Sequence, residues 1–296
     1  MNTRWPAIAA IWCCFLVWGL FPIYFRAMDA IRSDEFLYAR IVTSVVCLIG
    51  YFIYQGRLRK IWVEILRPTM LVRCAMTSLF LACNWYVYIW AIQNNQTIEA
   101  SLGYFITPIF NVLFGFWLFG ERMGRLQWMA VALVFLGVIY QIVMLGVVPW
   151  ASFGIGVAWA IYGGLRKKFG IAPVTGLFTE LLILLPLALL GWALIYADGQ
   201  GFNYHGHMGL LIGMLLSGLT TLVPLLLFLY GVSQLSMTTV GMTQYVTPTI
   251  QFLIAVFLFT EPFGIHRLVS FILIWIGLAL YSVHLFSTFK KAKHVS

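Results

Sequence analysis

The dominant feature of this sequence is a series of apolar runs, each about as long as a helix that crosses a lipid bilayer. Such a helix needs about twenty residues to span a hydrocarbon layer of roughly 30 Å. Only helices or closed barrels can span a membrane, and these runs do not alternate as barrel strands do. The sequence therefore predicts an all-α, polytopic membrane protein. Ten transmembrane helices fit, at residues 6–26, 35–55, 69–92, 97–119, 126–145, 149–165, 174–197, 207–231, 237–259 and 266–288.

The composition excludes a water-soluble globular protein. Of the 296 residues, 62% are apolar and only 9% are charged, whereas a soluble domain has about 45–50% apolar and about 25% charged residues. The net charge of +9 comes from short basic clusters between the apolar runs, which is typical of loops close to anionic headgroups. We therefore expect contact with membrane lipid and no nucleic-acid partner.

The distribution of basic residues predicts the orientation in the membrane. If the N-terminus is cytoplasmic, fourteen of the eighteen lysines and arginines fall on the cytoplasmic side. Cytoplasmic loops carry an excess of Lys and Arg, so this arrangement follows the positive-inside rule. Because the number of predicted spans is even, both termini are expected in the cytoplasm.

The chain also contains an internal repeat. Residues 90–140 align with residues 230–280 without a gap and match at nine identical positions; we call this shift the repeat offset. Each repeat would hold five helices, an odd number, so the second copy must be inverted in the membrane. We predict a first repeat at residues 1–145 and an inverted second repeat at residues 146–296, an architecture that many secondary transporters share. The identities include Thr107-Pro108 with Thr247-Pro248, Glu121 with Glu261, and Gly137 with Gly277.

Three charged side chains lie inside the predicted spans, where each costs about 2.5–3.5 kcal/mol on insertion scales and is a functional candidate. Arg40 and Glu99 are expected near the outer ends of their spans, either as a pair that captures or gates a charged substrate or as a salt bridge or interfacial anchor. Glu180 lies deeper, from the inner side. It is a candidate gate or coupling site, and the alternative is a structural hydrogen bond to a neighbouring helix.

Polar and aromatic side chains gather near the middle of the repeat-related spans. Together they suit a cavity that holds a small amphipathic substrate, although Asn, Gln and Thr also bond across helices in lipid. The candidate substrate-binding residues are Asn84, Trp85, Tyr88, Tyr104, Thr221, Gln244 and Tyr245. The same stretches also contain Thr107, Asn111, Thr220, Thr247 and Gln251.

Prolines interrupt several predicted spans. Each removes a helix hydrogen bond, so the resulting kink could act as a hinge or simply as a packing bend. The repeated Thr-Pro favours hinges at Pro108 and Pro248.

No motif in the sequence indicates an enzyme. We find no nucleophile with a base and an orienting partner, no phosphate-binding glycine loop, and no Cys at metal-ligand spacing. His205-Gly206-His207 could bind a metal weakly, but a solvated loop is the better interpretation. The five cysteines all lie inside apolar runs. We therefore predict no catalytic residues, no metal and no cofactor.

Several stretches resemble the RarD branch of the EamA-type drug/metabolite transporter superfamily. They include Asn84-Trp85, the segment from Glu99 to Ile106 with Pro108, Leu118 to Arg122, Tyr162-Gly163 before Arg166-Lys167-Lys168, and Gln244-Tyr245 with Pro248. The resemblance implies a bacterial inner-membrane protein of ten helices in two inverted halves, which exports or exchanges small metabolites or drugs through a central cavity. One departure is Ala39, where this branch is expected to have a His before the arginine of the second helix.

Together, these features predict a secondary-active transporter that works by alternating access, with a small-molecule substrate and with protons as a candidate coupling ion. The expected oligomeric state is a monomer or a weak homodimer. A passive channel or facilitator of the same fold is the nearest alternative. A membrane receptor or enzyme is more remote, because no soluble domain or clustered acid, base or metal set is visible.

Overall fold

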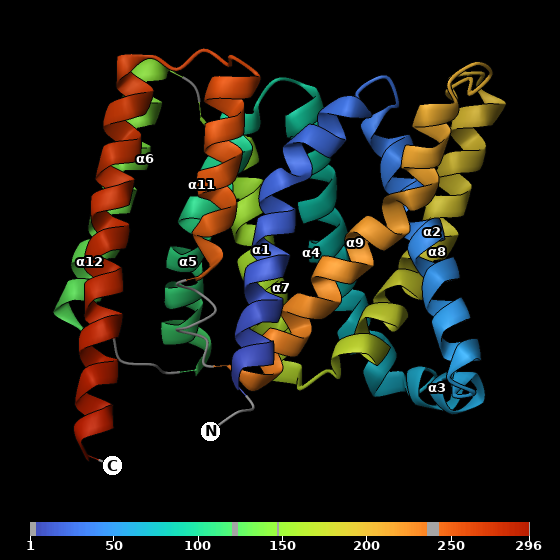
Figure 1. The fold of residues 1–296 in the computed structure, drawn as a ribbon, viewed down its shortest axis with the longest axis horizontal. Coiled ribbons are helices and arrows are strands. Elements are labelled where there is room, and N and C mark those ends of the chain that lie inside the picture. The colour runs from blue at the N-terminus through green and yellow to red at the C-terminus, as the bar shows by residue number, and fades with distance from the viewer. Residues whose placement is uncertain (1–3, 120–123, 147, 236–242, 296) are drawn as a thin grey trace.

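The computed structural model is helical throughout, and the residues it describes are 4–119, 124–146, 148–235 and 243–295 (Figure 1). No strand occurs in this part of the chain, so the all-α prediction is confirmed. The helices are α1 (Arg4–Ala27), α2 (Ser33–Tyr54), α3 (Leu58–Ile65), α4 (Pro68–Gln93), α5 (Thr97–Phe119), α6 (Arg125–Leu145), α7 (Trp150–Phe169), α8 (Pro173–Ala197), α9 (Met208–Gln234), α11 (Val246–Leu253) with its π-helical extension η1 (Ile254–Leu258), and α12 (Ile265–Val295).

All ten predicted spans coincide with helices, although the ninth is described only from residue 243. Among the described residues, five helices are long and apolar enough to cross a membrane by length and composition alone. These are Trp5–Ala27, Ser33–Tyr54, Pro68–Gln93, Pro173–Ala197 and Met208–Gly231. Large apolar side chains, such as Leu187 and Phe257, point outward from the bundle, as a surface that faces lipid requires.

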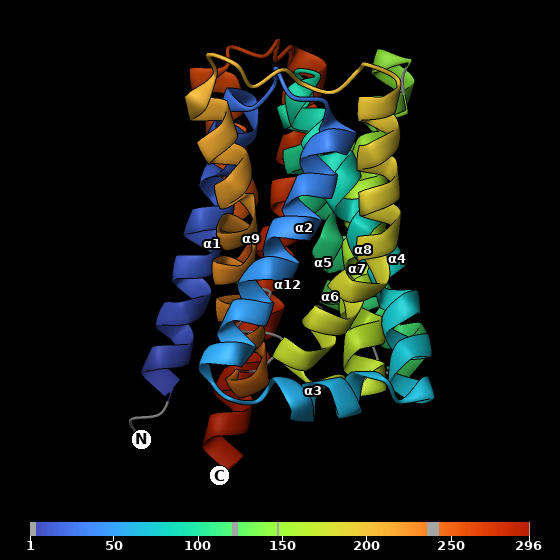
Figure 2. The same ribbon diagram turned by 90° about the vertical axis from the view of Figure 1, so that its right-hand side faces the viewer.

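One helix was not predicted. The segment that becomes α3 carries Arg59, Lys60 and Glu64, so it reads as a polar loop in a search for apolar runs. Ile61 and Ile65 are nevertheless buried and lie one helical turn apart, which makes α3 a short amphipathic helix. Figure 2 shows α3 lying across one end of the bundle, between α2 and α4. The spacing of these apolar residues was the signal that could have predicted it.

The structure places the prolines that were expected inside spans. Pro22, Pro186 and Pro224 lie inside helices, but Pro248 is in the first turn of α11, where a missing N–H removes no helix hydrogen bond. The ninth span is nevertheless interrupted three residues before Pro248: residues 243 and 244 are helical, Tyr245 is a turn residue with helical backbone angles, and α11 begins at Val246. Helix α5 continues through position 108, and the side chain of Pro108 lies outside the described ones. A hinge role stays a prediction for both residues.

The two halves of the chain have matching layouts. Helices α8, α9 and α12 begin one repeat offset after α2, α4 and α6, respectively. Their contacts match as well: α1 packs on α9 and α11, α7 packs on α4 and α5, and α2–α8 and α6–α12 are each a helix against its own counterpart. In Figure 1, α2 descends to the end where α3 lies, whereas α8 rises to the opposite end. This layout supports the predicted inverted duplication, although the division at residue 145 stays a prediction.

The α6–α12 contact follows this pseudo-symmetry at the level of single atoms. A Cβ added at Gly137 would lie 3.0 Å from the carbonyl oxygen of Ser270, and one added at Gly277 would lie 2.9 Å from that of Ala130. The two glycines are related by the repeat offset, and so are the two residues that provide the carbonyls. The two helices approach so closely because glycine has no side chain, and small residues commonly allow such packing in membranes.

We predict that Gly277→Ala destabilises the protein by about 1–3 kcal/mol, the usual range for an overpacked contact, because backbone atoms of α6 stand in the way. Gly50→Ala is the matched control, since a Cβ at Gly50 would meet nothing within 4 Å. It should be neutral or stabilising, because alanine favours a helix more than glycine does. Unfolding free energies in mixed detergent micelles measure both variants, and equal effects would contradict this view of the contact.

Candidate functional site

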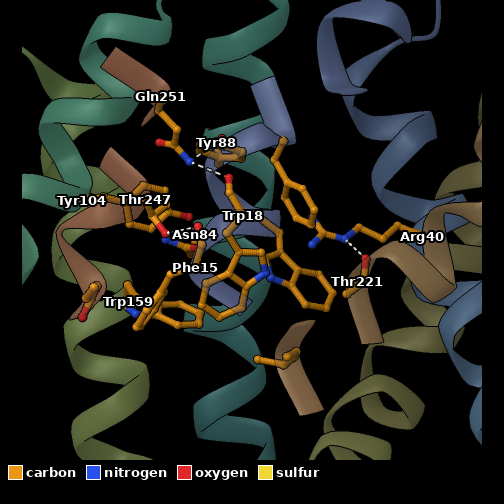
Figure 3. Close-up of a pocket in the computed structure, with 14 residues that line it drawn as sticks. Phe15, Trp18, Arg40, Asn84, Tyr88, Tyr104, Trp159, Thr221, Thr247 and Gln251 are labelled. Carbon is orange, nitrogen blue, oxygen red and sulfur yellow. Dashed lines mark hydrogen bonds between the residues drawn. The ribbon is translucent and has the colours of Figure 1, made fainter. Parts of the chain in front are cut away.

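A cavity lies in the middle of the bundle, between the two halves. Its empty volume, including the part open to solvent, is about 580 Å³. Helices α1, α2, α4 and α5 contribute to its wall from the first half, and α7, α9 and α11 contribute from the second (Figure 3). The lining residues are Phe15, Trp18, Phe21, Arg40, Asn84, Trp85, Tyr88, Tyr104, Trp159, Thr221, Leu225, Gln244, Thr247 and Gln251.

The structure brings together most of the side chains that were predicted to bind substrate. Six of the seven line the cavity, namely Asn84, Trp85, Tyr88, Tyr104, Thr221 and Gln244. Tyr245 does not: its ring packs against an apolar cluster that includes Phe252 and Phe271. Substrate binding by these residues stays a prediction.

Sequence reasoning missed the aromatic part of the wall. The rings of Trp18 and Trp159 lie edge to face, with centroids 5.7 Å apart, and Phe228 packs on both behind the lining. Phe15 and Phe21 belong to the same helix as Trp18. The sequence offered no signal for them, because an aromatic residue in an apolar run can face lipid, another helix or a cavity.

Several polar residues of the wall also bond across helices. The Gln251 amide donates to the carbonyl oxygen of Trp18 at 3.0 Å and to the Tyr88 hydroxyl at 2.9 Å. The Asn84 amide donates to the carbonyl oxygen of Ile155, and the Thr247 hydroxyl donates to that of Phe15. These side chains therefore both line the cavity and form interhelical hydrogen bonds.

Arg40 lies in the cavity wall and not at an outer mouth. Its side chain is almost fully buried, and its Nε donates to the Thr221 hydroxyl (Figure 3). Its guanidinium carbon is 4.2 Å from the Trp85 ring centroid. No ion pair joins it to Glu99 among the described residues. Helix α2 begins at Ser33, so Arg40 lies about two turns inside it, deeper than predicted.

Glu99 instead lies partly exposed in the first turn of α5. Its backbone carbonyl accepts a hydrogen bond from the Ser152 hydroxyl at 2.7 Å, which ties α5 to α7. The charged groups that act on its carboxylate are Arg267 and Glu261. The expected Arg40–Glu99 pair is therefore not formed in this structure.

Glu180 is fully buried and forms a network near the end of the bundle where α3 lies. Its carboxylate accepts hydrogen bonds from Thr77 at 2.5 Å, from the Arg166 guanidinium at 3.1 Å and from the Tyr162 hydroxyl at 3.2 Å. Arg166 is in the last turn of α7, and Thr77 is on α4. The network therefore joins the two halves, and we name it the Glu180 tie. Sequence analysis identified the glutamate but not its partners.

A second carboxylate joins the halves at the opposite end. Glu261 follows η1, is nearly buried, and accepts hydrogen bonds at 2.9 Å from the backbone N–H groups of Thr97 and Ile98. It therefore caps the N-terminus of α5, where a negative charge is favourable. The guanidinium of Arg26 pairs with the same carboxylate at 3.2 Å. We name this cluster the Glu261 tie; its glutamate was visible in the sequence only as one of the repeated identities.

A third buried carboxylate lies at this same end. Glu35 accepts hydrogen bonds from the hydroxyls of Tyr196 and Tyr204, both at 3.0 Å, and from the backbone N–H of Phe202. Burial, together with the nearby negative charge of Glu35, raises the pKa of Tyr204, so the phenol keeps the proton that it donates. The loop between α8 and α9 is thereby held against the start of α2.

Comparison with known proteins shows one family over nearly the whole chain. Residues 5–143 and 147–283 each match the EamA-like transporter family. An uncharacterized transporter of Pseudomonas aeruginosa is 38% identical over 90% of both chains. The protein RarD of Salmonella typhimurium is 34% identical over 98% of both chains, and the RarD of Escherichia coli K12 is 32% identical over 95% of this chain and 94% of its own.

The fold has a counterpart among solved structures. One crystal structure, 18% identical in sequence, superposes with a TM-score of 0.62 over 96% of this chain and 99% of its own. At this identity the likeness shows the fold alone.

We predict that Glu261→Gln lowers the free energy of unfolding by about 1–3 kcal/mol, because a neutral amide pairs less well with Arg26 and with the N-terminus of α5. Asp34→Asn is the matched control: it also removes a carboxylate from the first turn of a helix at the same end, but the Asp34–Arg32 pair is partly exposed to water, so the loss should be smaller. Unfolding in mixed detergent micelles compares the two. A loss for Asp34→Asn as large as that for Glu261→Gln would contradict the prediction.

Proposed function

Because this chain belongs to the EamA-like transporter family, in its RarD branch, we propose that it is a secondary-active transporter that moves a small metabolite by alternating access. Membership makes the chain a multi-pass membrane transporter of the drug/metabolite type. The observation that carries the finer proposal is the central cavity, which both halves line and which has a buried polar tie toward each end. Its location is the bacterial inner membrane, with both termini in the cytoplasm.

The two ties are suited to act as gates. In alternating access, the halves rock about a central site, so contacts on one side break while those on the other side hold. The Glu180 tie links α4 to α7 and α8, and the Glu261 tie links α1 and α5 to the segment before α12. Each crosses between the halves, so opening either side of the cavity must break one of them.

The Glu180 tie offers a route for proton coupling. A carboxylate that gains a proton loses its charge attraction to Arg166 and one acceptor site for hydrogen bonds. The tie would then weaken on the side where the proton binds, which is the linkage that a proton-driven exporter or exchanger requires. Because helices of one chain line the whole cavity, a monomer is sufficient for this mechanism.

A passive channel of the same architecture is the alternative, and kinetics separate the two. Purified protein in proteoliposomes, supplied with a panel of metabolites and drug-like compounds, should show saturable uptake of at least one compound. That uptake should accelerate when the same compound is loaded on the opposite side. Flux that neither saturates nor accelerates would favour a channel, and no flux under any imposed gradient would contradict the proposal.

We predict that Glu180→Gln abolishes stimulation of transport by a pH gradient but retains exchange of substrate for substrate, because glutamine keeps the shape of the tie without a titrating group. Glu64→Gln is the matched control, since Glu64 is a partly exposed carboxylate on α3 at the same end and should leave both activities unchanged. Uptake measured with and without an imposed pH gradient tests this. Full proton stimulation in Glu180→Gln would exclude Glu180 as the coupling site.

A further inference from the structure

The buried cation in the cavity wall has no anionic partner in the described part of the chain. Two other arginines, Arg26 and Arg166, are paired with Glu261 and Glu180, but no carboxylate lies within ion-pair distance of Arg40. Only its Nε forms a hydrogen bond, to Thr221, and the two terminal nitrogens bond to no described residue. The titratable groups that face it are the phenols of Tyr24, Tyr88 and Tyr104, which are neutral when protonated.

This arrangement is costly unless something completes it. A buried charge is strongly unfavourable without a partner, and the face of Trp85 compensates only in part, since a cation–π contact contributes about 0.5–2 kcal/mol. The planar guanidinium presents its terminal N–H groups as a fork that matches a carboxylate. The missing partner is therefore an anion that enters the cavity.

The other lining residues indicate the shape and polarity of the rest of that molecule. Flat aromatic rings line the space: Trp85 packs against Arg40. Trp18 and Trp159 also line it and pack edge to face (Figure 3). Tyr88 and Tyr104 also line the cavity and pack together, with ring centroids 5.5 Å apart. The polar groups other than Arg40 are amides and hydroxyls without charge. Such walls favour a body with a flat apolar face.

We propose that the cavity binds an organic monoanion, in which a carboxylate contacts the terminal nitrogens of Arg40 and a flat apolar body lies between the aromatic rings. The inference rests on the proposed function only in treating the bound molecule as cargo. An organic cation is disfavoured by the charge of Arg40. A dianion is disfavoured because Arg40 is the only cationic side chain in the described lining.

Three probes with one carbon skeleton test the charge preference directly. They are 3-phenylpropanoate, 3-phenylpropanamide and 3-phenylpropylamine, which are negative, neutral and positive at pH 7. Calorimetric titration of the full-length protein in lipid nanodiscs should show the acid binding at least about tenfold more tightly than the amide, since a hydrogen bond to a charged group contributes about 1.5–3 kcal/mol. The amine should bind most weakly.

Variants of Arg40 then locate the preference. Arg40→Gln should bind the acid and the amide with equal affinity. Arg40→Lys keeps a positive charge and should retain a reduced preference for the acid, so it still tests the inference if Arg40→Gln fails to fold. Arg32→Gln is the matched control, because Arg32 is an exposed cation outside the cavity that pairs with Asp34. It should behave as the wild type.

The outcomes separate this inference from the proposed function. Tighter binding of the amide or the amine by the wild type, no detectable binding of the acid, or an unchanged preference in Arg40→Gln would each overturn the inference. Binding of the acid with the expected preference but no transport of any compound would leave the anion site standing and remove the transporter mechanism. Saturable transport of neutral compounds alone would support the transporter mechanism and remove the anion site.

Discussion

A charge that is buried in a protein surrounded by lipid must find its partner inside the protein, and this requirement organises the structure. Two glutamates of the second half, Glu180 and Glu261, each receive an arginine and further donors, and at least one donor to each comes from the first half. These bonds lie toward opposite ends of the bundle and leave the middle to the cavity. Arg40 faces that middle with a hydroxyl and an aromatic ring in place of a carboxylate.

The repeat shows how the two halves have diverged around this requirement. Arg26 and Arg166 are related by the repeat offset, end the related helices α1 and α7, and each pair with a glutamate. Arg40 and Glu180 are related by the same offset and stand at the same place in α2 and α8, but they carry opposite charges. One half therefore presents a cation to the cavity where the other presents an anion to an ion pair. An inverted pair of halves with unlike charges cannot have two equivalent states, so the two sides of the membrane are distinguished.

Much of this was predictable because membrane helices are governed by simple rules. In the described part of the chain, length and hydropathy placed every predicted span on a helix, since an apolar run in lipid that does not alternate as a barrel strand does must be helical. Six of the seven candidate binding residues line the cavity, because uncharged polar groups in mid-span point away from lipid. The failures were positional: α3 was hidden by its charges, Tyr245 packed outside the cavity, and Arg40 lay deeper than its span boundary suggested.

The sequence by itself determined the class of fold, the number of long apolar helices and the likeness of the two halves, because these follow from hydrophobic length and from identities at one fixed spacing. Only the tertiary structure decided which charges meet. Glu261 caps a helix that begins 164 residues earlier in the chain, and Glu99, which looked like the partner of Arg40, faces other groups. No periodicity encodes such pairings, because they depend on how the helices rotate about their axes and at what depth they cross.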